Sequence, residues 1–340
     1  MPESLTLRVP DPDGRWSAVR IATDAPLPAR ELERREGAWV LDLPPLRLDR
    51  VEYELEIEHP GGGTETVADP SHDVVAPGAF GSKSVLEAPG YAAPAWLAAD
   101  APEGTITDVA LGRIMRRQLV APVWAPAGLA AGQPAPVLLA HDGPEYDHLA
   151  RLTHWAAVMV AQDRLPPFRL ALLPPGDRDN WYSASEGYAR ALTQQLLPAL
   201  REAVPVEGPV AGMGASLGAL AMLHAHRRHP HALQALFLQS GSYFTPETDG
   251  QESGFSRFAR IAPVVRGVLR MRRPYEHPVP VTLTCGAEEE NAANNRAMAA
   301  ALERQGYPVR FVENRDMHNY TGWRDTFDPH LTDLLALLWR

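Results

Sequence analysis

The pattern of apolar and polar positions changes once along the chain, near residue 100. Before it, apolar and polar residues alternate in short segments, most regularly at residues 51–58, which read Val-Glu-Tyr-Glu-Leu-Glu-Ile-Glu. Such alternation places one face of a sheet on a core and the other in water. Residues 5–9 and 38–43 have the same character, so we expect a small β-sandwich over residues 1–100. Residues 88–102, rich in Pro and Ala, predict a linker.

Beyond residue 100 short apolar runs are separated by longer stretches with helical spacing. The apolar runs are residues 136–140, 168–173, 209–213, 233–238, 279–284 and 309–312, and the clearest helical stretches are 188–200 and 292–305. Alternation of strand and helix predicts a mostly parallel sheet covered on both faces by helices. We therefore expect an α/β domain over residues 101–340.

Length, composition and charge narrow the class of protein. The chain has 340 residues, of which 45% are hydrophobic and 22% charged, with one cysteine and a formal net charge of -10. These values exclude a disordered tail, a disulfide-stapled secreted module and a histone-like nucleic-acid binder, and the length favours two domains. The negative charge lies in front: residues 1–100 hold 9 basic and 18 acidic residues, whereas residues 101–340 hold 23 and 24.

The sequence also bears on location and partners. It begins Met-Pro-Glu-Ser-Leu, without the basic stretch and apolar run of a signal peptide, and no window approaches about 18 uninterrupted apolar residues. We expect a cytoplasmic protein with no membrane partner and no nucleic-acid partner; the oligomeric state is left open. The sole cysteine, Cys285, is expected to be a small buried hydrophobe.

The most informative motif is Gly214-Ala215-Ser216-Leu217-Gly218, which matches Gly-x-Ser-x-Gly. It follows a short apolar strand and opens a helix, which is the context of a nucleophile elbow. In such an elbow the glycines let strand and helix approach, the serine hydroxyl is exposed on a strained turn, and the N–H of Leu217 points at a developing oxyanion. The motif predicts Ser216 as a nucleophile; an ordinary Gly/Ser turn is the alternative.

Partners for Ser216 occur in the order that this fold requires, with the acid after a later strand and the histidine after the last. Glu288-Glu289-Glu290 follow the strand that ends at Gly286, and His318 follows the strand at 309–312. His318 would take the serine proton, and a carboxylate would hold the imidazole in the right tautomer. We choose Glu289, because the acid usually lies three residues after the glycine that ends the strand. Glu288 and Glu290 stay open as alternatives.

Several further segments occur in a recognisable order. They are Asp142-Gly143, Leu165-Pro166-Pro167, Leu196-Leu197-Pro198, the pentapeptide around Ser216, Gln239-Ser240-Gly241-Ser242-Tyr243, and His318 before Trp323-Arg324. Together they resemble the enterochelin-esterase-like and esterase D branch of the α/β-hydrolases. In the front part, Ala68-Asp69-Pro70, Phe80 to Leu86 and Pro89-Gly90-Tyr91 resemble the end of the immunoglobulin-like sandwich of enterochelin esterases. The resemblance implies an α/β-hydrolase fold preceded by a small immunoglobulin-like β-sandwich.

The resemblance implies further site residues. In that family the residues after the Asp-Gly pair supply the second oxyanion donor, which assigns the N–H of Gly143. The family often has Arg, Glu and an aromatic or aliphatic residue after the fourth strand, whereas this chain reads Asp-Arg-Asp-Asn-Trp-Tyr-Ser at 177–183. Because that loop borders the substrate in related proteins, the substrate class does not transfer with the fold. The candidate substrate-binding residues here are Arg178, Trp181, Tyr243 and Trp323.

Residues 255–273 form an arginine-rich segment without acidic residues. Apolar residues at helical spacing, Phe258, Ile261, Val265 and Val268, predict a helix. In this topology we expect the segment at the carboxyl edge of the sheet, above the nucleophile. Arg257 and Arg260 could then lend positive potential to an anionic substrate such as a catecholate siderophore. A packed helix with a solvated basic face is the alternative.

Other motifs are weaker. His224, His226, His229 and His231 lie along one helix end without a carboxylate or cysteine at ligand spacing, so we expect no metal site and no cofactor. Residues 78–84 lack the order of a phosphate loop, because Ser82 separates the glycine from Lys83. His277 precedes the acid and His330 lies in a terminal helix pattern, so both are minor alternatives to His318.

These observations predict a serine hydrolase acting on a small-molecule carboxylic ester. Ser216 attacks the carbonyl, the N–H groups of Leu217 and Gly143 hold the oxyanion, His318 shuttles the proton, Glu289 orients it, and water resolves the acyl-enzyme. An enterochelin-like siderophore lactone is one candidate ester. Acyl transfer to an alcohol is an alternative on the same scaffold, and a non-catalytic binding protein with a vestigial triad is a third. An intact serine, acid and histidine in order argue against the last.

Overall fold

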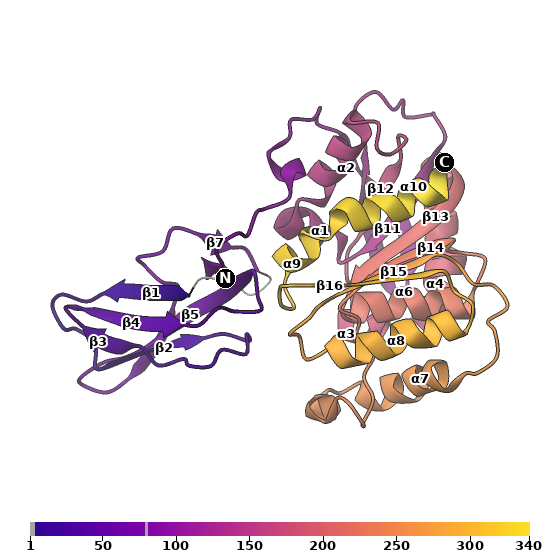
Figure 1. Cartoon of the computed structure of the whole chain (residues 1–340). Helices are drawn as coiled ribbons and strands as arrows, with labels where there is room; N and C mark the ends of the chain where they lie inside the picture. The colour runs from indigo at the N-terminus through magenta and orange to yellow at the C-terminus, as the bar shows by residue number, and fades with distance from the viewer. Residues whose placement is uncertain (1–3, 79–80) are drawn as a thin grey trace. The chain divides into compact units, whose positions relative to one another are not determined.

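The structure is a computed structural model that describes residues 4–78 and 81–340 (Figure 1), so Met1, Pro2, Glu3 and Phe80 of the sequence argument lie outside the described residues. The chain divides into two compact units. The first comprises the described residues up to Ala93 together with two later segments, Gly286–Glu289 and Asn314–Gly322. The second comprises Pro94–Cys285, Glu290–Glu313 and Trp323–Arg340.

The part of the first unit up to Ala93, called the front sandwich below, is built of antiparallel sheets. One sheet has the order β1 (Leu5–Pro10), β4 (Ala38–Leu43), β3 (Glu33–Arg35); the other has β2 (Ala18–Ala22), β5 (Arg50–Glu58), β8 (Lys83–Glu87), β7 (Val75–Ala76), with β6 (Thr64–Val67) paired to β5. Tyr53 and Leu55 of β5 are completely buried, in one core with Val9 of β1 and Leu41 of β4. The apolar residues along β5 therefore face the core of a small β-sandwich, while the glutamates between them lie on the opposite, partly exposed face.

The second unit is organised around an eight-stranded sheet. Its order is β16 (Val309–Asn314), β15 (Val281–Gly286), β14 (Ala235–Gln239), β13 (Val206–Ala215), β11 (Ala135–His141), β12 (Arg169–Leu173), β10 (Arg117–Ala125), β9 (Thr105–Ile114). The strands from β15 to β12 pair in parallel, and β10 and β9 are antiparallel. Cys285 is buried in β15.

Helices cover both faces of this sheet, with α2 and α10 on one side and α4, α6 and α8 on the other (Figure 1). The α-helices are α1 (Gly143–Ala150), α2 (Leu152–Ala161), α3 (Arg178–Tyr182), α4 (Glu186–Ala191), α5 (Leu197–Ala203), α6 (Leu217–Arg228), α7 (Phe258–Arg270), α8 (Ala292–Arg304), α9 (Tyr320–Arg324) and α10 (Thr332–Trp339). Short 3-10 turns lie at Ala95–Ala98 and Gly250–Gly254, and π-helical turns at Leu192–Leu196 and Phe327–Leu331. The predicted α/β class with a small β-sheet domain in front is confirmed.

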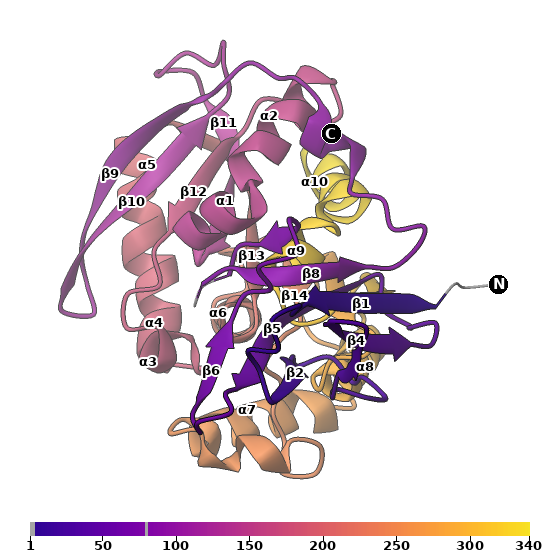
Figure 2. The same cartoon turned by 90° about the vertical axis from the view of Figure 1, so that its left-hand side faces the viewer.

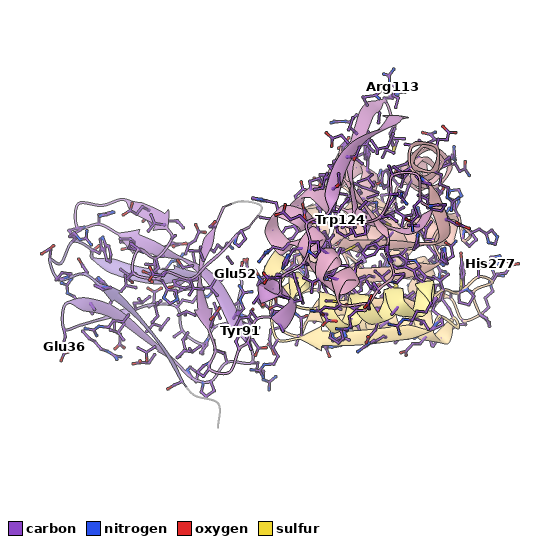
Figure 3. The ribbon with its side chains drawn as sticks, turned by 90° about the horizontal axis from the view of Figure 1, so that it is seen from above. Glu36, Glu52, Tyr91, Arg113, Trp124 and His277 are labelled. Atoms are coloured by element: carbon purple, nitrogen blue, oxygen red, sulfur yellow. The ribbon has the colours of Figure 1, made fainter. Side chains whose placement is uncertain are left out.

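Two features differ from the sequence expectations. The hairpin of β9 and β10, side by side in Figure 2 and with Arg113 near its far end in Figure 3, was not predicted. Its outer strand β9 is mostly exposed, so an apolar run does not mark it. The expected linker contains a 3-10 turn that buries Trp96. Across residues 4–78 and 81–340, each helix falls short of the length or apolar character needed to cross a bilayer.

The stability of the fold is expected to depend on pH through His226 of α6. Its ring is buried, with centroids 5.7 Å from those of both Tyr275 and Tyr307, and burial lowers its pKa from 6.5 to about 4. The folded protein therefore keeps this ring neutral where the unfolded chain takes up a proton. The fold therefore has its full stability above pH 6.5, the pKa of the ring in the unfolded chain, and loses stability as pH falls from there to about 4.

We expect His226→Phe to flatten the pH dependence of stability. From pH 7 to about pH 4.5 the free energy of unfolding of the wild type should fall by about 2 kcal/mol more than that of the variant. Urea denaturation of both proteins at the two pH values measures the difference. Equal losses in the two proteins would show that His226 does not titrate in this way.

Candidate active site

Ser216 occupies the turn between β13 and α6. Its backbone has φ 54° and ψ −124°, a conformation that costs a residue with a side chain of order 1–3 kcal/mol. The turn is fixed because the N–H of Ser216 donates to the carbonyl oxygen of Gln239, 2.9 Å away. A Cβ at Gly214 would lie 2.6 Å from the backbone carbon of Gly218, so the close approach of strand and helix requires glycine there.

The loop after β14 contacts this turn through Ser242, which the sequence reasoning quoted only as part of a motif. Its Oγ lies 3.1 Å from the Oγ of Ser216, and its N–H donates to the Ser216 carbonyl oxygen over 3.1 Å. Asn295 fixes the same loop, because its amide accepts from the N–H of Gly241 and donates to the Gly241 carbonyl oxygen. The loop after β14 thus places a second hydroxyl within hydrogen-bond distance of the Ser216 Oγ.

The second group of candidates lies on the loops after β15 and β16, both in the first unit. The Nδ1 of His318 is 2.9 Å from Oε2 of Glu289, while Oε1 of Glu289 accepts from the N–H of Gly286 at 2.8 Å. The Glu289 side chain is only 1% exposed, against 35% for His318. Glu288 instead lies 3.8 Å from Arg47, and Glu290 is exposed. Among the three glutamates, Glu289 is the one beside His318.

Gly143 and Arg178 lie near one another through Asp142. Gly143 begins α1, and a Cβ there would lie 2.3 Å from the Cα of Leu172, so β12 packs directly on this glycine. The guanidinium of Arg178 makes a two-pronged ion pair with Asp142, with Nε 3.0 Å from Oδ1 and Nη2 2.9 Å from Oδ2. Asp142 itself has φ 49° before the helix. The donor role of the Gly143 N–H stays a prediction.

The aromatic candidates for substrate binding are buried. Trp181 is 2% exposed and stacks on Tyr188 with ring centroids 5.4 Å apart, and Tyr243 is 0% exposed. Trp323 is 8% exposed, and its Nε1 donates to Ser240. These rings belong to the packed interior, where large apolar surfaces are best removed from water. A role of these rings in substrate binding stays a prediction.

The arginine-rich segment forms α7, which packs beside α8 (Figure 1). Ile261 and Val265 are buried as the apolar spacing predicts. The guanidinium of Arg260 donates to the carbonyl oxygen of Ser183 at 2.7 Å and to Oδ1 of Asn180 at 3.1 Å, which ties α7 to the end of α3. Arg257 precedes the helix, and within the described part of the chain its buried Nε has no hydrogen-bond partner. The contacts favour a packed helix.

The weaker sequence candidates are placed as follows. His224 and His226 are buried, and His277 lies at the outer edge of the second unit (Figure 3). His330 falls in the π-helical turn at Phe327–Leu331. Within residues 4–78 and 81–340 there is no cluster of three His, Cys, Asp or Glu side chains that could hold a metal. The strand β8 begins at Lys83, where a phosphate loop would open a helix.

One buried histidine near the turn was missed. His141 ends β11 and lies beneath the start of α6, where its Nδ1 is 3.0 Å from the carbonyl oxygen of Gly218 and its Nε2 is 2.9 Å from the hydroxyl of Tyr188. Burial lowers its pKa to about 4, so it is a neutral bridge between these groups. Its position just before Asp142-Gly143 was the available signal.

Comparison with known proteins identifies the family. A family model described as "Putative esterase" matches residues 112–334. No curated protein matches the chain. Among solved structures, enterobactin esterase from Shigella flexneri with 2,3-di-hydroxy-N-benzoyl-serine is similar at 19% identity and TM-score 0.77, with 99% of this chain and 94% of that chain covered. Ferric enterobactin esterase from Salmonella typhimurium is similar at 18% identity and TM-score 0.77, with 99% of this chain and 93% of that chain covered.

A third similar structure, described as a ferulic acid esterase, covers 71% of this chain and 99% of its own at 17% identity and TM-score 0.57. At these identities the structures establish the fold. The family model covers well over half of the chain and agrees with the family expected from the motifs. The chain belongs to this esterase family and is a carboxylic ester hydrolase.

Proposed function

We propose that the enzyme cleaves its ester in two steps through an acyl-enzyme on Ser216. The Ser216 Oγ attacks the ester carbonyl while His318 takes its proton, and the N–H groups of Leu217 and Gly143 donate to the oxyanion. His318 then returns the proton to the leaving alkoxide. In the second step water attacks the acyl-enzyme and loses a proton to His318. His318 passes this proton to the leaving Ser216 Oγ, so that the acid is released and the Ser216 hydroxyl and the neutral imidazole are restored.

The observation that carries this proposal is the geometry of the turn at Ser216. A serine with positive φ between a parallel strand and a helix is the nucleophile-elbow conformation, and it is maintained here by the Ser216–Gln239 hydrogen bond and by glycine on both sides. The following N–H, that of Leu217, begins α6, where the helix dipole and the unpaired amides favour negative charge. The turn thus supplies both a nucleophile and an oxyanion donor.

The Glu289–His318 pair supplies the base. With the carboxylate at Nδ1, the imidazole keeps its proton on that nitrogen and offers Nε2 as the acceptor for the serine proton. The carboxylate also stabilises the imidazolium that forms when the proton arrives. Because Glu289 is nearly inaccessible and its other oxygen is held by Gly286, this orientation is fixed before substrate binds.

For the substrate we propose an ester that carries a phenolic aromatic ring, such as a catecholate siderophore lactone. The similar structures are esterases of enterobactin and of ferulic acid, and both of these compounds carry phenolic rings. Arg257 would supply positive potential to an anionic substrate, since Arg260 is already engaged with α3.

A panel of esters tests this substrate class. We expect kcat/KM for a catecholate trilactone and for a feruloyl ester to exceed that for a matched alkyl ester by at least about tenfold. Arg257→Gln should raise KM for the anionic trilactone and leave KM for neutral esters unchanged. Equal kcat/KM across the panel would contradict the aromatic specificity. Transfer of the acyl group to added methanol in preference to water would instead identify an acyltransferase.

A further inference from the structure

The segment that carries His318 is attached to the front sandwich by a buried ion pair. Arg50, the first residue of β5, is only 3% exposed at its side chain, and its Nη1 lies 3.1 Å from Oδ2 of Asp316, which is 7% exposed. Its Nη2 lies 3.0 Å from the Glu52 carboxylate. All of these residues belong to the first unit, as do Glu289 and His318.

Asp316 is the centre of the His318 loop. Its Oδ1 accepts from the N–H of Met317 at 2.8 Å and from the side-chain amide of Asn319 at 2.9 Å. The carboxylate therefore binds the residue before His318 and the residue after it. A Cβ on Gly286 would lie 2.1 Å from the Asp316 carbonyl oxygen, which means that the two loops touch backbone to backbone. The backbone of Asp316 is therefore packed against the loop that carries Glu289.

In this network one buried guanidinium lies between two carboxylates, those of Asp316 and Glu52. Burial alone would lower the pKa of Arg50, but the Asp316 and Glu52 carboxylates offset it and hold that pKa above the ordinary value. Removing one member of such a buried pair leaves an uncompensated charge, which is far more costly than losing an ion pair at the surface. Without Arg50, the Asp316 carboxylate would be more stable where it contacts water or another donor. We expect the loop that carries His318 to shift when Asp316 moves there.

We propose that Arg50 is a positioning residue that, through Asp316, holds His318 against Glu289. The front sandwich is then part of the catalytic apparatus, because one of its strands fixes the histidine loop. This inference rests on the proposed role of His318 in ester cleavage. Arg50 touches neither the ester nor the reacting atoms.

The test compares Arg50→Met, which keeps the length of the side chain and removes its charge, with a matched control on the same loop. Arg315 forms a pair with Asp49 at 2.7 Å, but the two side chains are 55% and 40% exposed, far more than those of Arg50 and Asp316. We expect Arg50→Met to lower kcat for p-nitrophenyl acetate at least about tenfold with little change in KM, and Arg315→Met to change kcat less than about twofold. Arg50→Lys should recover part of the loss.

A double-variant cycle separates positioning from general damage. If Arg50 acts through Asp316, kcat of the Arg50→Met and Asp316→Asn double variant should be no lower than that of the worse single variant. The inference would be overturned if the fold-loss of kcat in the double variant equalled the product of the two single losses. It would also be overturned if Arg50→Met kept the kcat of the wild type. If thermal denaturation shows that Arg50→Met is unfolded at the assay temperature, the same cycle is carried out with Arg50→Lys and Asp316→Asn and decides the question.

A readout independent of the nucleophile distinguishes this inference from the proposed mechanism. The proton shared by His318 and Glu289 should give a downfield proton resonance in the wild type and in Ser216→Ala, and it should weaken or vanish in Arg50→Met. An unchanged resonance in Arg50→Met contradicts the inference alone. A normal response of the resonance together with full activity in Ser216→Ala contradicts the mechanism alone.

Discussion

Ser216→Ala is expected to lower kcat for p-nitrophenyl acetate by about 10⁴-fold or more, because no other group replaces the attacking oxygen. The residual rate would come from the oxyanion donors and from binding. Alanine keeps the left-handed backbone of the turn, so the fold should be unaffected, and thermal denaturation can verify this. Loss of labelling by a fluorophosphonate probe provides a second readout of the same hydroxyl.

Two further variants make this result specific. Ser242→Ala removes the neighbouring hydroxyl, 3.1 Å away, and should keep fluorophosphonate labelling, which tells the two serines apart. Ser216→Gly should lose activity like the alanine variant but gain roughly 1 kcal/mol of stability, since glycine adopts the positive φ without strain. Wild-type turnover in Ser216→Ala would place the nucleophile elsewhere.

The sequence predicted the fold wherever periodicity was strong. The alternation along 51–58 and the apolar runs of the parallel strands correspond to β5 and to the strands from β11 to β16, because burial on one or both faces imposes such patterns directly. The hairpin of β9 and β10 escaped, because an edge strand with one wet face has a weak pattern. Nor can composition show that loops after β15 and β16 group with the front sandwich.

Within the candidate site, the turn at Ser216 was predictable because a short motif determines its backbone. Ser216 follows from its glycine neighbours, and the choice of Glu289 agrees with its 2.9 Å approach to His318. The burial of Tyr243 and Trp181 was not predicted, since a sequence position near the candidate site does not reveal whether a ring points outward or into the core. Arg50 could not be found, because its partner Asp316 is remote in the chain and only the folded structure joins them.

Glu289→Gln is the second variant with a large expected effect, and it discriminates among the three consecutive glutamates. The glutamine can keep the hydrogen bond from the Gly286 N–H at its Oε1, so the loop should hold its shape. Its amide would then donate toward Nδ1 of His318, which drives the ring proton to Nε2, where the serine proton must be accepted. The imidazolium also loses its counter-charge.

With the wrong tautomer and no counter-charge, kcat of Glu289→Gln should fall by about 10³–10⁴-fold, while KM changes little because Glu289 is too buried to touch the ester. Glu288→Gln and Glu290→Gln are the matched controls. Glu288 has only a distant partner in Arg47, at 3.8 Å, and Glu290 faces water, so each should retain kcat within about twofold. A large loss in either control with near-normal turnover in Glu289→Gln would transfer the acid's role to that neighbour. Because all three variants differ from wild type by the same single charge, a change in net charge cannot account for the difference.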